Sequence, residues 1–267
     1  MFWVNGYPSN HISLTDRSFQ YGDGCFTTIL TCRGELVQWA LHRARMEKCL
    51  TVLNIPQPDW NQVHDWLSKA ALGAPKAGLR LNITRGEGGR GYSSLGISDT
   101  NIVISHFDYP EHYTQWARTG IELGISEKRL GINPLLAGHK HNNRLEQILA
   151  KQDIDKQGLV DGLVLDISGH VVETTMANLF WLKDGKLYTP SMEKNGVSGV
   201  MRQQVIEELT TKAISVEVGH YKLSHLLNAD EVFMTNSICC VIPVNKILDK
   251  TFEVGALTRD LQEKFSS

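Results

Sequence analysis

The chain has 267 residues, of which 42% are hydrophobic and 21% are charged, and its formal net charge is −2. Such a chain can bury a sizeable core in one or two domains. The small negative charge argues against nucleic acid as a partner, and no run of about 18 apolar residues is present to span a membrane. The first ten residues do not resemble a signal peptide, and the five cysteines lack zinc-like spacing. We therefore expect a cytoplasmic protein with reduced thiols.

Strands and helices mix through the first part of the chain. In order, the hydrophobic patterns predict a strand and turn at 2–6, two strands within 25–39 joined at Arg33-Gly34, a helix with Leu41, Met46, Cys49, Leu50 and Leu53 on one side, a helix at 60–72, and strands at 78–84 and 101–107. The next segment, 109–119, is polar and aromatic without a clear period. We interpret it as the connector between an N-terminal domain, 1–108, and a C-terminal domain, 120–267.

The second part of the chain predicts a similar mixture. Its elements are a strand at 121–126, a helix containing Leu145, Ile148 and Leu149, hairpin strands within 163–175 and 178–190, a helix after Gly199 with Met201, Val205 and Leu209 on its inner face, and strands at 231–236 and 240–247. Strands and helices do not alternate strictly, as they would in a doubly wound sheet. The predicted fold class is therefore α+β, with two mixed α/β domains.

A lysine between two histidines lies where a loop meets a predicted helix. Lys140 is flanked by His139 and His141 and follows a loop that contains Pro134 and Gly138. Most lysines are solvated surface charges, but a lysine can form a Schiff base if its surroundings lower its pKa or a cofactor traps it. A metal site is the third interpretation, although residues at i and i+2 do not share a helix face.

A glycine-rich stretch, "RGEGGRGY" at 85–92, separates two predicted strands. It does not match a nucleotide-binding loop, because no helix opens from its glycines and no Gly-Lys-Ser/Thr follows. The plain interpretation is a flexible hairpin loop. Its two arginines, Arg85 and Arg90, nevertheless suit carboxylates, since a guanidinium group matches a carboxylate with two parallel hydrogen bonds.

Two further positions suit a charged ligand. The helix after Gly199 follows Ser198, and a helix N-terminus offers N–H groups and a positive dipole end to a phosphate. The simpler interpretation of Ser198 is an N-cap. Glu173 ends a predicted strand, where it is either an exposed carboxylate or the partner of a cation such as a protonated ring nitrogen.

Six blocks of the sequence resemble, in order and spacing, the fold-type IV pyridoxal-phosphate enzymes, which include branched-chain and D-amino-acid aminotransferases and aminodeoxychorismate lyases. The blocks are "DRSFQYGDGCFTT", "LHRARM", "LAGHKHNNRLEQ", "DISGHVVETTMANLFW", "GVSGVMRQ" and "ADEVFMTNS". The resemblance runs nearly end to end. It implies the cofactor pyridoxal 5'-phosphate, a homodimer, and a C-terminal domain that carries the Schiff-base lysine and most of the cofactor site.

The resemblance also implies roles for single residues. Lys140 is the implied Schiff-base lysine and general base, and Glu173 the implied partner of the cofactor ring nitrogen. The other implied cofactor-binding residues are Arg45, Gly199, Val200, Met201, Asn236 and Ser237. The substrate is expected to be a small dicarboxylate, and the expected substrate-binding residues are Arg85, Arg90, Thr27 and Thr28.

Two features favour the lyase branch of this family. The aminotransferases carry a glutamate after the aromatic residue of the first block, whereas Phe26 is followed here by Thr27 and Thr28. The runs "RGEGGRGYS" and "RLGINPLLAGHKHNNRLEQ" resemble the lyases that make 4-aminobenzoate for folate by eliminating pyruvate. A D-amino-acid or branched-chain aminotransferase with the same site remains the alternative, and a non-catalytic metal- or small-molecule-binding protein is the alternative of another class.

Overall fold

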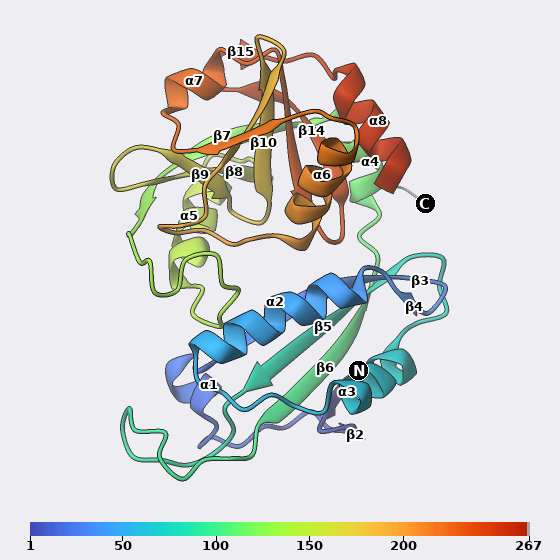
Figure 1. The fold of residues 1–267 in the computed structure, drawn as a ribbon, viewed down its shortest axis with the longest axis vertical. Helices are drawn as coiled ribbons and strands as arrows, with labels where there is room; N and C mark the ends of the chain where they lie inside the picture. The colour runs from blue at the N-terminus through green and yellow to red at the C-terminus, as the bar shows by residue number, and fades with distance from the viewer. Residues whose placement is uncertain (266–267) are drawn as a thin grey trace. The chain divides into compact units, whose positions relative to one another are not determined.

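The computed structural model describes residues 1–265, which form two compact units. The first unit contains Met1–Tyr109 together with His139–Asn143, and the second contains Pro110–Gly138 and the chain from Arg144 onward. Each unit combines helices with its own β-sheet (Figure 1), so the predicted α+β class is confirmed. Among the helices of residues 1–265, none combines the length and the apolar character of a membrane span.

The first unit is built on a six-stranded sheet. Its elements are β1 (Phe2–Val4), β2 (Tyr7–Pro8), α1 (Arg17–Tyr21), β3 (Gly24–Cys32), β4 (Glu35–Leu36), α2 (Trp39–Val52), α3 (Trp60–Ala70), β5 (Ala77–Thr84) and β6 (Asn101–Asp108). The strands lie in the order β2-β1-β6-β5-β3-β4, and all neighbours are antiparallel. The predicted strands are present as β1, the β3–β4 hairpin, β5 and β6. The two predicted helices are present as α2 and α3.

Local chemistry explains where several of these elements begin and turn. Asp16 and Asp59 cap α1 and α3, because each carboxylate accepts hydrogen bonds from two backbone N–H groups of the first turn. Arg33 and Gly34 both have positive φ, of 51° and 86°, as a tight two-residue hairpin turn requires. The chain therefore reverses between β3 and β4 at the predicted dipeptide.

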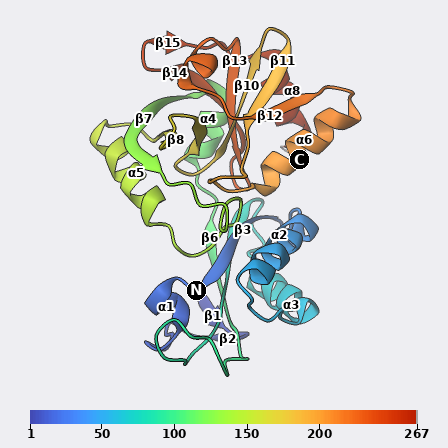
Figure 2. The ribbon, with the colours of Figure 1, turned by 60° about the vertical axis from the view of Figure 1, so that its left-hand side comes forward.

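Helices α2 and α3 pack on one face of this sheet (Figure 2). Side chains alternate between the two faces of a strand, so every second residue of β3 and β5 enters the core under the helices. The core includes Cys25, Ile29, Met46, Leu50, Val63, Leu67, Leu79, Leu81 and Ile83. Thr27 shares the helix-facing side of β3, whereas Phe26 and Thr28 point to the other side.

The second unit is built on a nine-stranded mixed sheet. Its elements are α4 (His112–Thr119), β7 (Ile121–Leu130), α5 (Leu145–Lys156), β8 (Asp161–Asp166), β9 (Val171–Thr174), β10 (Asn178–Lys183), β11 (Lys186–Pro190), α6 (Val200–Thr211), β12 (Val216–Gly219), α7 (Leu223–Leu227), β13 (Glu231–Asn236), β14 (Cys240–Ile247), β15 (Lys250–Thr251) and α8 (Ala256–Phe265). The strand order is β12-β11-β10-β13-β14-β7-β8-β9, with β15 beside β14. Three pairings are parallel: β11 with β12, β14 with β7, and β7 with β8.

The segment interpreted as a connector, 109–119, is largely helical. It contains α4, whose Tyr113 and Trp116 pack against the main core of the second unit. The second unit therefore begins at Pro110 and not at residue 120. The sequence did not reveal this helix because its eight residues are fewer than the roughly 11–18 over which a helical period is usually read.

The helix predicted after the lysine is present as α5. The residues that indicated it, Leu145, Ile148 and Leu149, are 73%, 49% and 50% exposed, whereas Ala150 and Ile154 are fully buried. Helical spacing was therefore a correct signal for the element. It did not identify the side of the helix that packs on the unit, because that choice depends on the neighbouring strands β7 and β8.

Candidate active site

Lys140 lies in a short irregular segment, His139–Asn143, that pairs with the start of β3. The Phe26 N–H donates to the Lys140 carbonyl at 3.0 Å, and the Asn142 N–H donates to the Gly24 carbonyl at 2.9 Å. These bonds explain why the lysine belongs to the first unit, whereas the sequence analysis assigned it to the C-terminal domain.

Two side-chain amides tie the same segment to the corner that follows α1. Asn142 Nδ2 donates to Ser18 Oγ at 2.7 Å, and Asn143 Nδ2 donates to the Gly22 carbonyl at 3.1 Å. Gly22 has a φ of 69°, and a Cβ there would lie 2.3 Å from Asn143 Oδ1. Glycine is therefore required at this corner both for its backbone conformation and for its close approach to the lysine segment.

The Lys140 side chain extends over the ring of Phe26. Its Nζ lies 4.7 Å from the ring centroid, and the Arg80 Cζ lies 4.1 Å from the same centroid. Two cations therefore share one aromatic ring, whose π-electrons attract both. Thr28, on the same side of β3 as Phe26, is paired with Arg80 across the sheet. The half-buried Thr28 thus lies on the Phe26 side of β3, next to Arg80 in the sheet.

Thr27 is placed differently, although it is the next residue in the chain. It is fully buried under α2, where its Oγ1 lies 2.6 Å from His42 Nδ1 and accepts a hydrogen bond from Arg45 Nη2 at 2.5 Å. The hydroxyl is thus engaged inside the unit, and this geometry does not support the substrate contact expected of it. It instead connects Thr27 to the arginine predicted to bind the cofactor phosphate.

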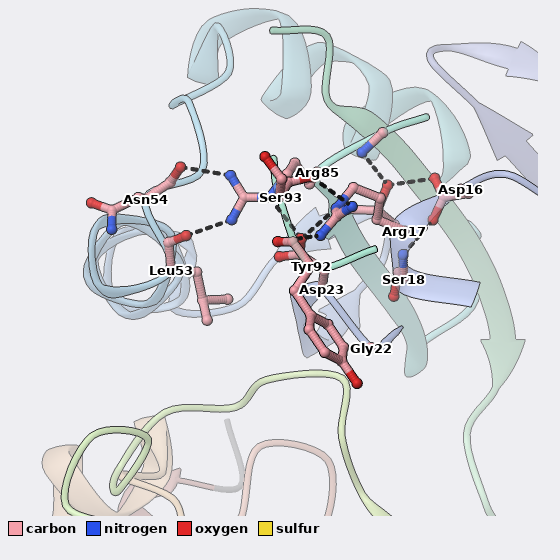
Figure 3. A network of polar contacts seen from close by, with 12 residues as sticks. Asp16, Arg17, Ser18, Gly22, Asp23, Leu53, Asn54, Arg85, Tyr92 and Ser93 are labelled. Carbon is pink, nitrogen blue, oxygen red and sulfur yellow. Dashed lines mark hydrogen bonds and ion pairs between the residues drawn. The ribbon is translucent and has the colours of Figure 1, made fainter. Parts of the chain in front are cut away.

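Arg85 also has a different environment from the one that the sequence suggested (Figure 3). Its Nε donates to Asp23 Oδ2 at 2.7 Å, and its two other nitrogens donate to the Asn54 and Leu53 carbonyls at 2.7 and 2.6 Å. All three guanidinium nitrogens thus bind groups at the end of α2 and at the α1–β3 corner. This geometry does not support a substrate role for Arg85. Arg90, by contrast, is exposed on the glycine-rich loop.

A second arginine meets the same carboxylate. Arg17 Nε donates to Asp23 Oδ2 at 2.9 Å, and the other Arg17 nitrogens donate to the carbonyls of residues 91–93 at 3.1 Å (Figure 3). We call Arg17, Asp23 and Arg85 the arginine clamp. It joins the glycine-rich loop and the end of α2 through one largely buried carboxylate.

In the second unit, Glu173 is buried at the end of β9. Its Oε2 accepts a hydrogen bond from the Val197 N–H at 2.9 Å, and Asn178 holds the same segment by donating to the Val197 carbonyl at 2.8 Å. A Cβ on Gly196, whose φ is 75°, would lie 3.3 Å from Glu173 Oε2 and closer still to two other side chains. Glu173 is therefore not the exposed strand carboxylate of the simpler interpretation.

The segment after Val197 leads into α6. Asn178 Oδ1 accepts from the Gly199 N–H at 3.1 Å, and a Cβ on Gly199 would lie 2.1 Å from that oxygen, so glycine is required. The first hydrogen bond of the helix runs from the Gln203 N–H to the Gly199 carbonyl, so the N–H groups of Val200 and Met201 precede the helical ladder. The predicted inner face of Met201, Val205 and Leu209 is confirmed as buried.

The turn after β13 is fixed by Asn236. Its Oδ1 accepts from the N–H groups of Ile238 and Cys239, at 2.9 Å each, and this leaves Ser237 half-buried within the turn. Asn236 thus shapes the backbone around the hydroxyl that the resemblance assigns to the phosphate.

Taken unit by unit, the residue types suit the parts of a phosphorylated pyridine aldehyde. Lys140 is a primary amine for the aldehyde, and Glu173 is a buried carboxylate suited to a protonated ring nitrogen. Arg45, the N-terminus of α6 and the Ser237 hydroxyl are groups that bind phosphate. For comparison, no group of three or more His, Cys, Asp or Glu side chains within residues 1–265 is arranged to hold a metal ion.

Several of the residues whose contacts are described above were not predicted from the sequence. His42 could have been found from its spacing, because residues three apart lie on one helix face and His42 precedes Arg45 by three. Arg17 and Asp23 stand in the block "DRSFQYGDGCFTT", but nothing local in it indicates that they meet Arg85. Phe26 was noted only as the aromatic residue before the two threonines.

The chain belongs to the class IV amino-transferase family, whose model matches residues 24–247. It is 53% identical to an aminodeoxychorismate lyase of Vibrio harveyi over 266 residues, which cover 98% of both chains. An aminodeoxychorismate lyase of Bacillus subtilis is 30% identical over 98% of this chain and 92% of its own length. The crystal structure of 4-amino-4-deoxychorismate lyase from Pseudomonas aeruginosa superposes with a TM-score of 0.93 at 34% identity, covering 99% of this chain and 97% of that one. These matches confirm the fold-type IV resemblance.

Proposed function

We propose that this protein is a pyridoxal-phosphate-dependent carbon–oxygen lyase that converts 4-amino-4-deoxychorismate into 4-aminobenzoate and pyruvate, a step towards folate. The observation that carries this function is the 53% identity to the Vibrio harveyi lyase along 98% of the chain. The absence of an acidic residue after Phe26 and the "RGEGGRGYS" run support the same branch of the family. The substrate is a small molecule with two carboxylates.

The reaction requires that a proton leave the ring carbon that bears the amine. The C–O bond to the neighbouring enolpyruvyl group then breaks, and the six-membered ring becomes aromatic, which favours the products. When bound, pyridoxal 5'-phosphate stabilises negative charge at the carbon that loses the proton. The enolpyruvyl fragment becomes pyruvate when its methylene carbon gains a proton.

Lys140 is proposed to carry the cofactor and then to move both protons. Its Nζ, once released by the substrate amine, takes the proton from the ring carbon as a general base. The same Nζ can return a proton to the methylene carbon of the leaving fragment. Its segment is held to β3 by backbone bonds on both sides, at Phe26 and Gly24, which supports a fixed position for the amine.

Glu173 and the phosphate ligands are proposed to orient the cofactor. Glu173 holds a proton at the cofactor ring nitrogen, because an adjacent negative charge stabilises the protonated form. Arg45 and Ser237 bind the phosphate together with the N–H groups of Val200 and Met201. Gly199 and Asn236 act indirectly, since they shape the backbone that presents these groups.

The substrate carboxylates are proposed to meet cations and hydroxyls on the Phe26 side of β3. Thr28 remains a candidate, because it lies on the side of β3 that Phe26 and Lys140 share. Arg80 joins it, since it contacts the same aromatic ring and is paired with Thr28. Arg90 stays a candidate from the loop, whereas the engaged groups of Thr27 and Arg85 favour other roles for those residues.

The remaining proposals concern the oligomeric state, the location and the partners of the protein. We propose a cytoplasmic homodimer without nucleic-acid partners, as the family resemblance and the net charge of −2 suggest. Light scattering coupled to size-exclusion chromatography tests the dimer. A mass near that of one 29.9 kDa chain would contradict it.

The function is tested by counting product per active site with no keto acid present. An elimination returns the cofactor unchanged, so the holoenzyme should form 4-aminobenzoate and pyruvate over many turnovers. An aminotransferase given only an amine stops after one turnover, because its cofactor is left in the amine form. A single burst that added pyruvate or 2-oxoglutarate restores would therefore support the aminotransferase alternative.

A further inference from the structure

His42 is a buried histidine for which the proposed chemistry has no direct use. It lies on α2, one turn before Arg45, and its side chain is 1% exposed. Its Nδ1 lies 2.6 Å from Thr27 Oγ1, the same oxygen that Arg45 Nη2 approaches to 2.5 Å. One threonine oxygen thus joins a buried imidazole to an arginine of the proposed phosphate site.

The hydrogen-bonding capacity of the three groups determines the direction of each bond. A guanidinium group can only donate, so Thr27 Oγ1 accepts from Arg45. The threonine hydroxyl has one proton, and His42 Nδ1 can accept it. The opposite arrangement, with a protonated Nδ1 donating to Thr27, would leave the hydroxyl proton without this acceptor in a buried place, which is unfavourable. Nδ1 is therefore the acceptor, and the imidazole proton is on Nε2.

Burial and neighbouring charge support a neutral ring. Desolvation lowers the pKa of His42 well below its ordinary value, and the positive charges of Arg45 and Lys140 lower this pKa further. A protonated His42 would turn Nδ1 into a donor that competes with Arg45 for the same oxygen. The chain of hydrogen bonds from Arg45 to Thr27 to His42, together with the burial of the ring, favours an uncharged imidazole.

We propose that His42 is a positioning residue for Arg45: it accepts the Thr27 proton, which turns the Thr27 lone pairs towards the guanidinium group and fixes its orientation. The inference rests on the proposed function to the extent that Arg45 binds the cofactor phosphate. His42 itself does not touch the cofactor. Its loss should weaken cofactor binding and leave the rate of the saturated enzyme nearly unchanged, because the phosphate lies away from the bond that breaks.

Two substitutions of nearly equal shape separate the hydrogen bond from simple packing. His42→Asn places an amide oxygen near the position of Nδ1 and keeps an acceptor for Thr27, whereas His42→Leu fills similar space without one. We expect His42→Leu to raise the dissociation constant for pyridoxal 5'-phosphate by roughly 3- to 10-fold, the size of one hydrogen bond between uncharged groups. His42→Asn should restore most of this loss. Thr27→Ser and Thr27→Val form a second pair with the same expected contrast.

The coupling to Arg45 is tested with a double substitution. If His42 acts through Arg45, then His42→Leu should have no further effect on cofactor affinity when Arg45→Ala is already present. The exposed His64 provides a control, since His64→Leu should leave the dissociation constant unchanged. Equal affinities of the His42→Leu and His42→Asn variants, both folded by circular dichroism, would overturn the proposal.

The proton on the His42 ring can be tested without cofactor. Nitrogen NMR of the apo-protein labelled at histidine should show an unprotonated Nδ1 and a protonated Nε2 for the signal that His42→Asn removes. A proton on Nδ1 would overturn the proposal. If Arg45→Ala left cofactor affinity unchanged while the NMR signal was as expected, the phosphate role of Arg45 would fail and the His42–Thr27 bond would stand.

Discussion

Arg85 and Arg45 belong to the same unit and were both expected to bind anions, yet the structure surrounds them differently. Arg85 donates to Asp23 and to two backbone carbonyls, so all three of its nitrogens are hydrogen-bonded within the fold, and it shares the Asp23 carboxylate with Arg17. Arg45 donates to the neutral hydroxyl of Thr27. The positive charges of Arg45 and Lys140 both lower the pKa of the His42 imidazole.

The difference in hydrogen-bond partners indicates a structural role for one arginine and is consistent with the proposed role of the other in cofactor binding. An arginine held by a buried carboxylate contributes to the architecture, because losing the arginine removes buried hydrogen bonds and losing the carboxylate leaves guanidinium charge unmatched. The positive charge of Arg45, whose guanidinium group donates to a neutral hydroxyl, lowers the pKa of the neighbouring His42. We therefore expect substitutions in the arginine clamp to change stability, and substitutions around Lys140 and Arg45 to change cofactor chemistry.

The largest effect is expected at the lysine beside Arg45. Lys140→Ala should abolish turnover, because it removes the only amine proposed to carry the cofactor and move protons. Borohydride treatment of the variant should no longer attach the cofactor covalently, as peptide mass spectrometry of wild type and variant would show. Lys69→Ala, at the end of α3, is the control and should behave as wild type. A labelled peptide centred on another lysine would contradict the assignment.

The arginine clamp should be the region where stability is most sensitive. Asp23→Asn leaves two largely buried guanidinium groups without their shared charge, so the free energy of unfolding should fall by about 3–5 kcal/mol. Urea unfolding measures this change. Glu47→Gln breaks the half-exposed pair with Arg43 and should cost no more than ~0.5 kcal/mol. Equal effects of the two substitutions would mean that the clamp contributes no more than a surface pair.

Replacing each arginine by alanine compares the two regions directly. Arg45→Ala should raise the cofactor dissociation constant by roughly 10- to 100-fold, the value of about 1.5–3 kcal/mol for a charge-assisted hydrogen bond. Arg85→Ala should lower the free energy of unfolding while the folded fraction binds cofactor nearly as tightly as wild type. Titration of apo-protein by visible absorbance, with urea unfolding in parallel, gives both quantities. If Arg85→Ala weakened cofactor binding and Arg45→Ala lowered only the free energy of unfolding, the roles assigned to the two arginines would be reversed.

The smallest effect concerns pH. Because the pKa of His42 is lowered in the folded state, the unfolded chain binds the additional proton as pH falls below the ordinary histidine value of about 6.5. Stability should therefore decrease towards acid, by at most about 1.4 kcal/mol per pH unit from this residue, until the folded-state pKa is reached. His42→Asn should show a shallower decrease than wild type in urea unfolding at pH 7 to 5. Parallel curves would mean that His42 does not lose its proton on folding.

Local patterns were a reliable guide to most of the elements. The hairpin at Arg33-Gly34, the helix after Gly199 and the strand before Glu173 were predicted because periodicity and turn chemistry act over a few residues. Helix α4 escaped prediction because its eight residues are fewer than the window over which a helical period is usually read. The side on which α5 packs was also beyond the pattern, since Leu145 is exposed and Ile154 is buried.

The sequence by itself determined the order of the elements, the α+β class, the family blocks and the candidate roles of Lys140 and Glu173. Only the tertiary structure decided which side chains are engaged with one another. Arg85 meets Asp23 from 62 residues away, and Asn142 meets Ser18 from 124 residues away. Neighbouring Thr27 and Thr28 are separated because consecutive side chains of a strand point to opposite faces. Such partners are chosen by how distant segments pack, and a local pattern carries no record of that packing.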